Sequence, residues 1–205
     1  MDSIIFDLDG TLWDSRETVV MAWNKAIEQN DKIDHTLTKQ HLKETMGLQM
    51  HEIMQKLFPH LNAEMHNELI QSCGEIEGDF ISERGGVLYE NLEDVLRALS
   101  EKYRLFIVSN CQEGYIEAFY DYHGLDKYFQ DFENPGRTGL SKGENIKLIM
   151  ERNGLKDSVY VGDTAGDRKA AKDAGIPFVF AKYGFGEVED YDYAIDEFNE
   201  LLEIF

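Results

Sequence analysis

The sequence predicts an α/β protein with a doubly wound, Rossmann-like parallel sheet as its core and a small helical cap domain inserted into that core. Three observations support this fold class. The chain opens with a short apolar run of strand character that ends in two carboxylates, Asp7 and Asp9. A long stretch with helical spacing follows, and strand and helix patterns then alternate along the rest of the chain. Such alternation is typical of a parallel sheet covered by helices on both faces.

The first strand is predicted within residues 1–8, because this run is apolar and Gly10 allows a sharp turn after it. From about residue 15 to residue 84 the spacing is helical, with no convincing strand. The predicted domains are therefore residues 1–14 and 85–205 for the Rossmann-like core and residues 15–84 for the cap. Within the cap, helices are predicted at 15–29, 36–46, 49–58 and 62–83.

The alternating part begins after Gly85-Gly86. Strands are predicted at 104–108, 158–162 and 177–181, and helices at 91–102, 112–123, 141–153 and 165–174. The stretch 183–199 is predicted to form a closing strand and helix. In a sheet of this kind, ligands bind beyond the carboxyl ends of the strands.

The composition limits the possible partners. Forty acidic and 20 basic residues give a net charge of −20, which repels nucleic acid and acidic membrane surfaces. The two cysteines, Cys73 and Cys111, lie too far apart in sequence to suggest a zinc site or a disulfide framework. The N-terminus lacks the basic and long apolar regions of a signal peptide. We therefore expect a cytoplasmic protein with no nucleic-acid or membrane partner.

Polar residues follow three of the predicted strands. They are Asp7 and Asp9, then Ser109 and Asn110, then Asp163 and Asp167. Parallel strands end at one edge of the sheet, so these side chains are expected to converge. A calcium loop is excluded, because Leu12 and Thr18 stand where that motif requires glycine and glutamate. Nucleotide-binding glycine motifs are absent as well.

These residues carry a family resemblance. The chain resembles the haloacid dehalogenase-like hydrolases, whose four ordered motifs are similar to Asp7-Leu8-Asp9-Gly10-Thr11, Ser109, Lys142 and Gly162-Asp163-x-x-x-Asp167. The helical insertion is similar to the cap of the subgroup that contains phosphoglycolate phosphatases and beta-phosphoglucomutases. The resemblance spans nearly the whole chain.

The resemblance implies a reaction and a metal ion. Asp7 is expected to be the nucleophile that takes up the phosphoryl group, and Asp9 the general acid and then base. Mg²⁺ is expected as cofactor, held by Asp7, the backbone carbonyl of Asp9, and Asp163. Because Asp9 is present, cleavage of a carbon–halogen bond is disfavoured.

The remaining site residues are expected to support the phosphoryl group. Gly10, Thr11, Ser109, Asn110 and Lys142 are predicted to bind it, and Lys142 also counts among the catalytic residues. Asp167 is expected to orient Lys142 or to hold a metal-bound water. Ser141 is a good N-cap with Glu144 at the capping-box position, which places Lys142 in the first turn of a helix. A cation there opposes the helix dipole, which a bound phosphate would explain.

Other residues bear on the substrate. The cap loop at 46–51 contains the possible specificity residues Gly47, Leu48, Gln49 and His51, and it has no Arg or Lys. This puts phosphoglycolate in doubt as the substrate and leaves sugar phosphates, nucleoside monophosphates and pyrophosphate open. Cys111 is expected to be a pocket wall, and Trp13 either lines the entrance or packs the hinge.

The sequence thus predicts a Mg²⁺-dependent phosphatase that acts on a small phosphorylated metabolite. A phosphomutase for sugar phosphates is an alternative, although Thr11 after Gly10 resembles the phosphatases. A phosphonate hydrolase needs a cap lysine, and Lys43 and Lys56 only flank the loop. A non-catalytic phosphate- or metal-binding regulator is a third alternative, and the oligomeric state is left open.

Overall fold

The computed structural model describes residues 1–30, 33 and 35–205. Its core is a parallel sheet of six strands in the order β5-β4-β1-β6-β7-β8. The central strand β1 (Ser3–Phe6) is buried throughout and pairs with β4 (Arg104–Val108) and β6 (Ser158–Gly162). The outer strands are β5 (Phe129–Glu133), β7 (Phe178–Ala181) and β8 (Tyr193–Ile195).

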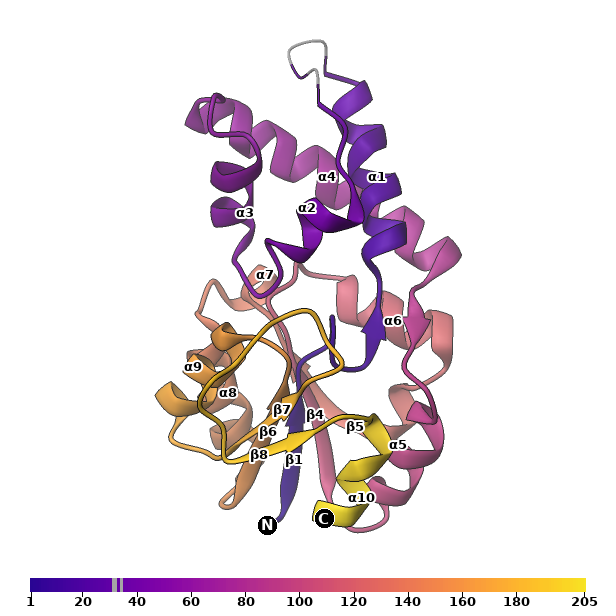
Figure 1. The fold of residues 1–205 in the computed structure, drawn as a ribbon, viewed down its shortest axis with the longest axis vertical. Helices are drawn as coiled ribbons and strands as arrows, with labels where there is room; N and C mark the ends of the chain where they lie inside the picture. Colours follow the sequence, from indigo (N-terminus) through magenta and orange to yellow (C-terminus); the bar gives the residue numbers. More distant parts are fainter. Residues whose placement is uncertain (31–32, 34) are drawn as a thin grey trace.

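Helices cover both faces of this sheet. Successive side chains of a strand point to opposite faces, so Ile4 and Phe6 pack on one side of β1 and Ile5 on the other. The first side is covered by α5 (Leu92–Ser100), α6 (Tyr115–His123) and α10 (Leu201–Ile204). The second is covered by α8 (Lys142–Asn153) and α9 (Ala165–Ala174). The predicted doubly wound class is confirmed (Figure 1).

The helical segment lies beyond one end of the sheet. It contains α1 (Arg16–Glu28), α2 (Lys39–Lys43), α3 (Met50–Leu57) and α4 (Ala63–Arg84), and α1 packs along α4. Figure 1 shows these helices at the end of the molecule opposite to both chain termini. None of the described residues between 15 and 84 forms a strand. Helix α2 is shorter than the predicted 36–46, because Thr38 caps its start and the chain turns at Gly47, with a φ of 80°.

Two short strands join the helical segment to the core. β2 (Trp13–Asp14) and β3 (Val87–Leu88) pair antiparallel where the chain leaves the core and where it returns. Two residues are too few for a periodic pattern, so this ribbon was not predicted. A Cβ at Gly86 would lie 2.8 Å from the Trp13 ring and 3.0 Å from the Asp14 carbonyl oxygen. Because Gly86 has no side chain, the segment before β3 can pack directly against Trp13 and Asp14 of β2.

Several predicted elements need correction. β5 was not predicted, because this edge strand has polar residues at three of its five positions. The short helix α7 (Pro135–Thr138) was also missed. Helix α6 begins at Tyr115 instead of residue 112, because Gly114 adopts a φ of 88°. The closing helix α10 starts at Leu201, after a 3₁₀ turn at Phe198–Glu200, and so lies beyond the predicted 183–199.

Among the described residues, the helices are all too short or too polar to cross a lipid bilayer.

Candidate active site

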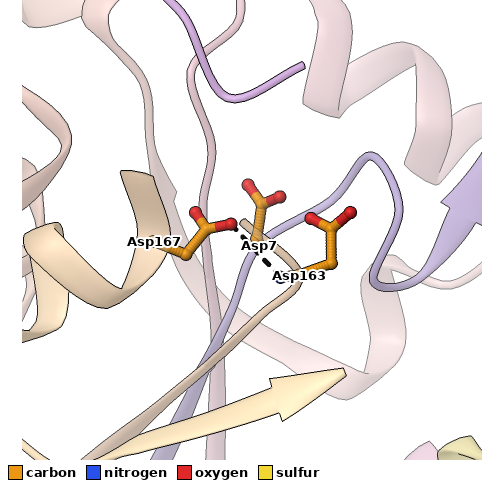
Figure 2. A group of neighbouring side chains, drawn as sticks. All are labelled: Asp7, Asp163 and Asp167. Carbon is orange, nitrogen blue, oxygen red and sulfur yellow. Dashed lines mark hydrogen bonds between the residues drawn. The ribbon is translucent and has the colours of Figure 1, made fainter. Parts of the chain in front are cut away.

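Three carboxylates meet at the end of the sheet that faces the helical segment. Asp7 follows β1, Asp163 follows β6, and Asp167 lies in the first turn of α9. All three are buried, and one oxygen of each lies within 4.8 Å of the others. Figure 2 shows Asp7 and Asp163 side by side at the strand ends, with Asp167 directed towards Asp7. The predicted convergence of these strand ends is therefore present in the structure.

A single lysine ties two of these carboxylates together. The Lys142 ammonium lies 2.8 Å from Asp7 Oδ1 and 2.6 Å from Asp167 Oδ1, and its side chain is only 6% exposed. Burial disfavours the charged ammonium, but the carboxylates of Asp167 and Asp7 outweigh that cost and raise the pKa of Lys142 well above its ordinary value. Lys142 is therefore a fixed positive charge beside Asp7.

The start of α8 holds this lysine in place. The Ser141 hydroxyl accepts a hydrogen bond from the Glu144 amide, and the Glu144 carboxylate accepts one from the Ser141 amide at 2.9 Å. This is the predicted capping box, and Lys142 is the first residue of the helix. Its charge opposes the helix dipole. The two facing carboxylates compensate for that unfavourable position.

Asp167 uses both of its oxygens within the protein. Oδ1 accepts from Lys142, while Oδ2 accepts from the amide of Thr164 at 2.9 Å and from its hydroxyl at 2.6 Å. The Asp163 amide also donates to Oδ2, at 3.2 Å, as the dashed line in Figure 2 marks. Asp167 therefore contacts Lys142 directly, and its expected role in orienting Lys142 stays a prediction.

Asp163 has an oxygen without a partner. Its Oδ2 accepts from the Phe185 amide at 2.6 Å, whereas its Oδ1 is buried with no hydrogen-bond partner in the described structure. Burial, followed by the charges of Asp167 and Asp7, raises the pKa of Asp163 well above its ordinary value. A divalent cation would reduce the repulsion between these carboxylates and would bind the unpartnered Oδ1 of Asp163. Hard carboxylate oxygens of this kind fit Mg²⁺.

Asp7 lies between these groups. Burial and the neighbouring charge of Asp167 raise its pKa to about 7, and Lys142 acts in the opposite direction. Gly10 supports the same region through its conformation, with a φ of 86°. A Cβ there would lie 2.2 Å from Asp163 Oδ2, so any side chain at residue 10 would displace Asp163.

Asp9 is set apart from the three clustered carboxylates. Its Oδ1 accepts from the Trp13 indole at 2.9 Å, the Ser15 hydroxyl at 2.5 Å and the Tyr115 hydroxyl at 3.0 Å. Burial raises the pKa of Asp9, and these three donors oppose that shift. All three known contacts fall on one oxygen. Asp9 also lines the adjoining cavity.

Trp13 and Tyr115 illustrate what the sequence missed. Trp13 is fully buried and packs edge-on against Tyr115 and Phe119, so of its two predicted positions it occupies the hinge. Tyr115 had no sequence signal as a site residue. It is separated from Asp9 by 106 positions and comes close only through the packing of α6.

The second strand end lies against the cap loop. Ser109 and Asn110 both line the cavity beside Asp7, and the Asn110 amide donates to the Gly47 carbonyl at 2.9 Å. Cys111 also lines the cavity, as expected for a pocket wall. Burial, with the charges of Asp9 and Asp7, raises the pKa of its thiol well above the ordinary value. Cys111 is therefore a neutral thiol and a poor nucleophile.

The cavity itself is small, about 70 Å³. Its floor is formed by the strand-end residues and Lys142, and its roof by side chains of α1, α3, α4 and the loop at Gly47 and Leu48. Gln49 and His51 line a neighbouring hollow of about 350 Å³ instead. Gly10 and Thr11 line neither hollow, so their predicted contact with a phosphoryl group stays a prediction.

One roof residue was missed entirely. Glu77 lies on the buried stripe of α4, where Leu69, Cys73 and Ile81 recur at intervals of four residues. A charged residue within such an apolar stripe is a signal that the sequence does contain.

Comparison with known proteins agrees with this geometry. Residues 4–181 match the family described as haloacid dehalogenase-like hydrolase. A phosphoglycolate phosphatase of Vibrio parahaemolyticus is 25% identical, over 98% of this chain and 94% of the relative. The phosphoglycolate phosphatase of Synechococcus elongatus is 28% identical, over 99% of this chain and 96% of the relative.

Solved structures share the fold. A predicted phosphoglycolate phosphatase from Haemophilus somnus superposes with a TM-score of 0.87 at 22% identity, covering 100% of this chain and 97% of the other. CbbY from Rhodobacter sphaeroides, solved in complex with phosphate, gives a TM-score of 0.83 at 17% identity over 98% and 96% of the two chains. With the family match over most of its length, the chain belongs to the haloacid dehalogenase-like hydrolases, as an enzyme of the phosphatase type.

Proposed function

We propose that this enzyme is a Mg²⁺-dependent phosphatase that hydrolyses a small organic phosphate monoester through an aspartyl-phosphate on Asp7. One observation carries the proposal. Asp7 is held by Lys142 and lies beside the unpartnered Asp163 Oδ1, at the floor of a small cavity roofed by the cap. The names of the relatives support phosphate-ester hydrolysis as the reaction.

The metal ion would be held by Asp7, the backbone carbonyl of Asp9, and Asp163. When bound, Mg²⁺ neutralises charge on the phosphoryl oxygens and on the clustered carboxylates. Lys142 adds a second positive charge beside Asp7. Together these charges allow an anionic phosphate to approach a carboxylate nucleophile, within a protein of net charge −20.

In the first step, a carboxylate oxygen of Asp7 attacks phosphorus, and the bond from phosphorus to the leaving oxygen breaks. Asp9 gives its proton to that oxygen, so the alcohol departs neutral. The three donors on Asp9 Oδ1 fix the orientation of this carboxyl group, and its raised pKa favours the protonated form that the step needs. Asp167 keeps Lys142 in position during the transfer.

In the second step, Asp9 takes a proton from a water molecule, and the resulting hydroxide attacks the phosphorus of the aspartyl-phosphate. Phosphate leaves and the Asp7 carboxylate is restored. The cap over the cavity limits access of bulk water to this intermediate. Thr11, Ser109 and Asn110 are proposed to donate hydrogen bonds to the phosphoryl oxygens, and Gly10 to let the chain pass close to them.

The test is phosphate release from a panel of phosphorylated metabolites with Mg²⁺, repeated with EDTA and with Asp7→Asn. We expect turnover to fall by at least about 10⁴-fold in the variant and to be lost in EDTA. Asp121→Asn, an exposed aspartate of α6, is the matched control and should turn over normally. Turnover that survives in Asp7→Asn would contradict the assigned nucleophile. Transfer of the phosphoryl group between sugar hydroxyls without net phosphate release would favour the phosphomutase alternative. Phosphate binding without any turnover would favour the regulator alternative.

The predicted cytoplasmic location is kept as part of this proposal, since the substrate class is that of small cellular metabolites.

A further inference from the structure

A buried carboxylate lies in the roof of the phosphate cavity. Glu77 projects from α4, is 4% exposed, and lines the same cavity as Asp7, Asp9 and Lys142. Among the described residues that form this cavity, Glu77 is the one charged side chain contributed by the cap. A bound phosphate ester would direct its leaving group towards the cap, because the phosphoryl group has to reach Asp7 on the floor.

The carboxylate of Glu77 can accept further hydrogen bonds beyond those it already makes. Gln112 donates to Oε1 at 2.8 Å, and the Trp23 indole donates to Oε2. Each carboxylate oxygen can accept two hydrogen bonds, so each keeps an unused lone pair. No Lys or Arg pairs with Glu77 within the part of the chain that the structure describes. A buried carboxylate without a cation is costly to keep charged, so a further hydrogen bond from a bound ligand would stabilise it.

The charges around the cavity favour one kind of leaving group. Lys142 is already shared between Asp7 and Asp167, which leaves Asp9 and Glu77 facing the space beyond the phosphoryl group. A second negative charge on the substrate would meet the Glu77 carboxylate, and Lys142 is the one Lys or Arg among the described residues that line the cavity. The small volume beside the phosphoryl site, about 70 Å³, also favours a short leaving group.

We propose that Glu77 determines specificity: it accepts a hydrogen bond from a hydroxyl or ammonium group on a short leaving group, and it excludes leaving groups that carry a negative charge. The substrate class is then the phosphate monoester of a small polyol or amino alcohol, and phosphoglycolate is a poor substrate. This inference rests on the proposed phosphatase function.

The test compares three two-carbon phosphates of nearly equal size at pH 8 with Mg²⁺: 2-hydroxyethyl phosphate, 2-aminoethyl phosphate and phosphoglycolate. Burial raises the pKa of Glu77 to about 7, so the carboxylate is mostly charged at this pH. For the wild-type enzyme we expect kcat/KM for the first two to exceed that for phosphoglycolate by about 100-fold. In Glu77→Gln that ratio should fall by at least about tenfold. The kcat/KM for 2-aminoethyl phosphate should decrease and the kcat/KM for phosphoglycolate should increase.

Two variants separate specificity from folding. Glu75→Gln changes the net charge equally at an exposed position of the same helix and should leave the ratio unchanged. Gln112→Ala removes the bond between the cap and the core but keeps the Glu77 charge, so it should lower turnover of all three substrates alike. A merely structural role for Glu77 would make Glu77→Gln behave like Gln112→Ala.

The outcomes distinguish the two proposals. If Asp7-dependent turnover exists but the wild-type enzyme accepts phosphoglycolate as well as the other two, or if the ratio is the same in Glu77→Gln, the inference is overturned and the phosphatase stands. If the enzyme hydrolyses larger phosphates and none of these three, the small leaving group is overturned. If no phosphate ester is hydrolysed at all, the proposed function itself fails.

Discussion

At the residue scale, the site is dominated by an imbalance of buried charge. The carboxylates of Asp7, Asp163 and Asp167 lie together with one ammonium, that of Lys142. Removing the only positive member of such a cluster leaves like charges uncompensated in a medium that screens them poorly. Lys142 therefore has a structural role as well as its proposed catalytic one.

Lys142→Met is expected to abolish turnover and to lower the free energy of unfolding by about 3 kcal/mol, because it leaves Asp7 and Asp167 buried without their partner. Urea denaturation at pH 7.5 and a phosphate-release assay measure the two effects. The matched control is Lys169→Met, whose partner Asp173 lies at an equally short 2.6 Å on the surface. An exposed pair of this kind should contribute little. Equal destabilisation by the two changes would count against the buried cluster as a stabilising unit.

At the element scale, two helices with similar N-caps have different tasks. Ser141 caps α8 through the Glu144 amide, and Asn62 caps α4 through the Met65 amide. Of these two helices, α8 carries a site residue in its first turn, namely Lys142. The accuracy with which Lys142 meets Asp7 therefore depends on how well the first turn of α8 is formed.

Ser141→Ala and Asn62→Ala should each lower the free energy of unfolding by about 1 kcal/mol, the usual effect of losing an N-cap side chain. Ser141→Ala should also lower kcat by about tenfold, because Lys142 is then held less accurately. Asn62→Ala should leave kcat unchanged. Thermal denaturation and steady-state kinetics on the two variants measure these effects. A kcat that falls equally in both variants would show that the N-cap residue of α8 has no special influence on the site.

At the scale of the whole molecule, the cap and the core share one hydrophobic cluster and are also joined by a few polar contacts. The β2–β3 ribbon forms the covalent connection, Asn110 donates to Gly47, and Gln112 donates to Glu77. Glu77 is the titratable member of this junction. The groups around it are the Trp23 indole, the Gln112 amide, the thiols of Cys73 and Cys111, the Tyr115 hydroxyl and the nearby charge of Asp9.

The pKa of Glu77 is raised from 4.5 to about 7 on folding, mainly by burial. The folded protein therefore keeps the proton over a pH range in which the unfolded chain has lost it. The resulting stabilisation is complete below pH 4.5 and is lost as the pH rises through 7. Glutamine at residue 77 does not titrate. Relative to Glu77→Gln, the wild-type protein should therefore lose about 2 kcal/mol of stability between pH 5.5 and pH 8.

Urea denaturation of both proteins at the two pH values measures this difference, and taking wild type minus variant cancels groups that titrate alike in both. The exposed Glu75→Gln is the control and should follow the wild-type protein at both pH values. A wild-type-minus-variant difference that does not change with pH would show that Glu77 is ionised throughout and that its burial is compensated in another way.

Regular elements were predictable because their signals are local. The strands 104–108 and 158–162 and the helix 165–174 were predicted at the positions where β4, β6 and α9 lie. β5 and the β2–β3 ribbon were missed, because they are held by pairing with strands remote in sequence and have no strong apolar pattern of their own. The capping box at the N-terminus of α8 was also predictable, because Ser141 and Glu144 are only three residues apart in sequence.

By itself the sequence determined the fold class and the floor of the site. Asp7, Ser109 and Asp163 follow strands of one parallel sheet, and parallel strands necessarily end at the same edge. Only the tertiary structure decided what surrounds these residues: which donors hold Asp9, and that Glu77 stands in the roof. Tyr115 reaches Asp9 across 106 positions and Gln112 reaches Glu77 across 35. Such contacts depend on how whole helices pack, and no local periodicity records that packing.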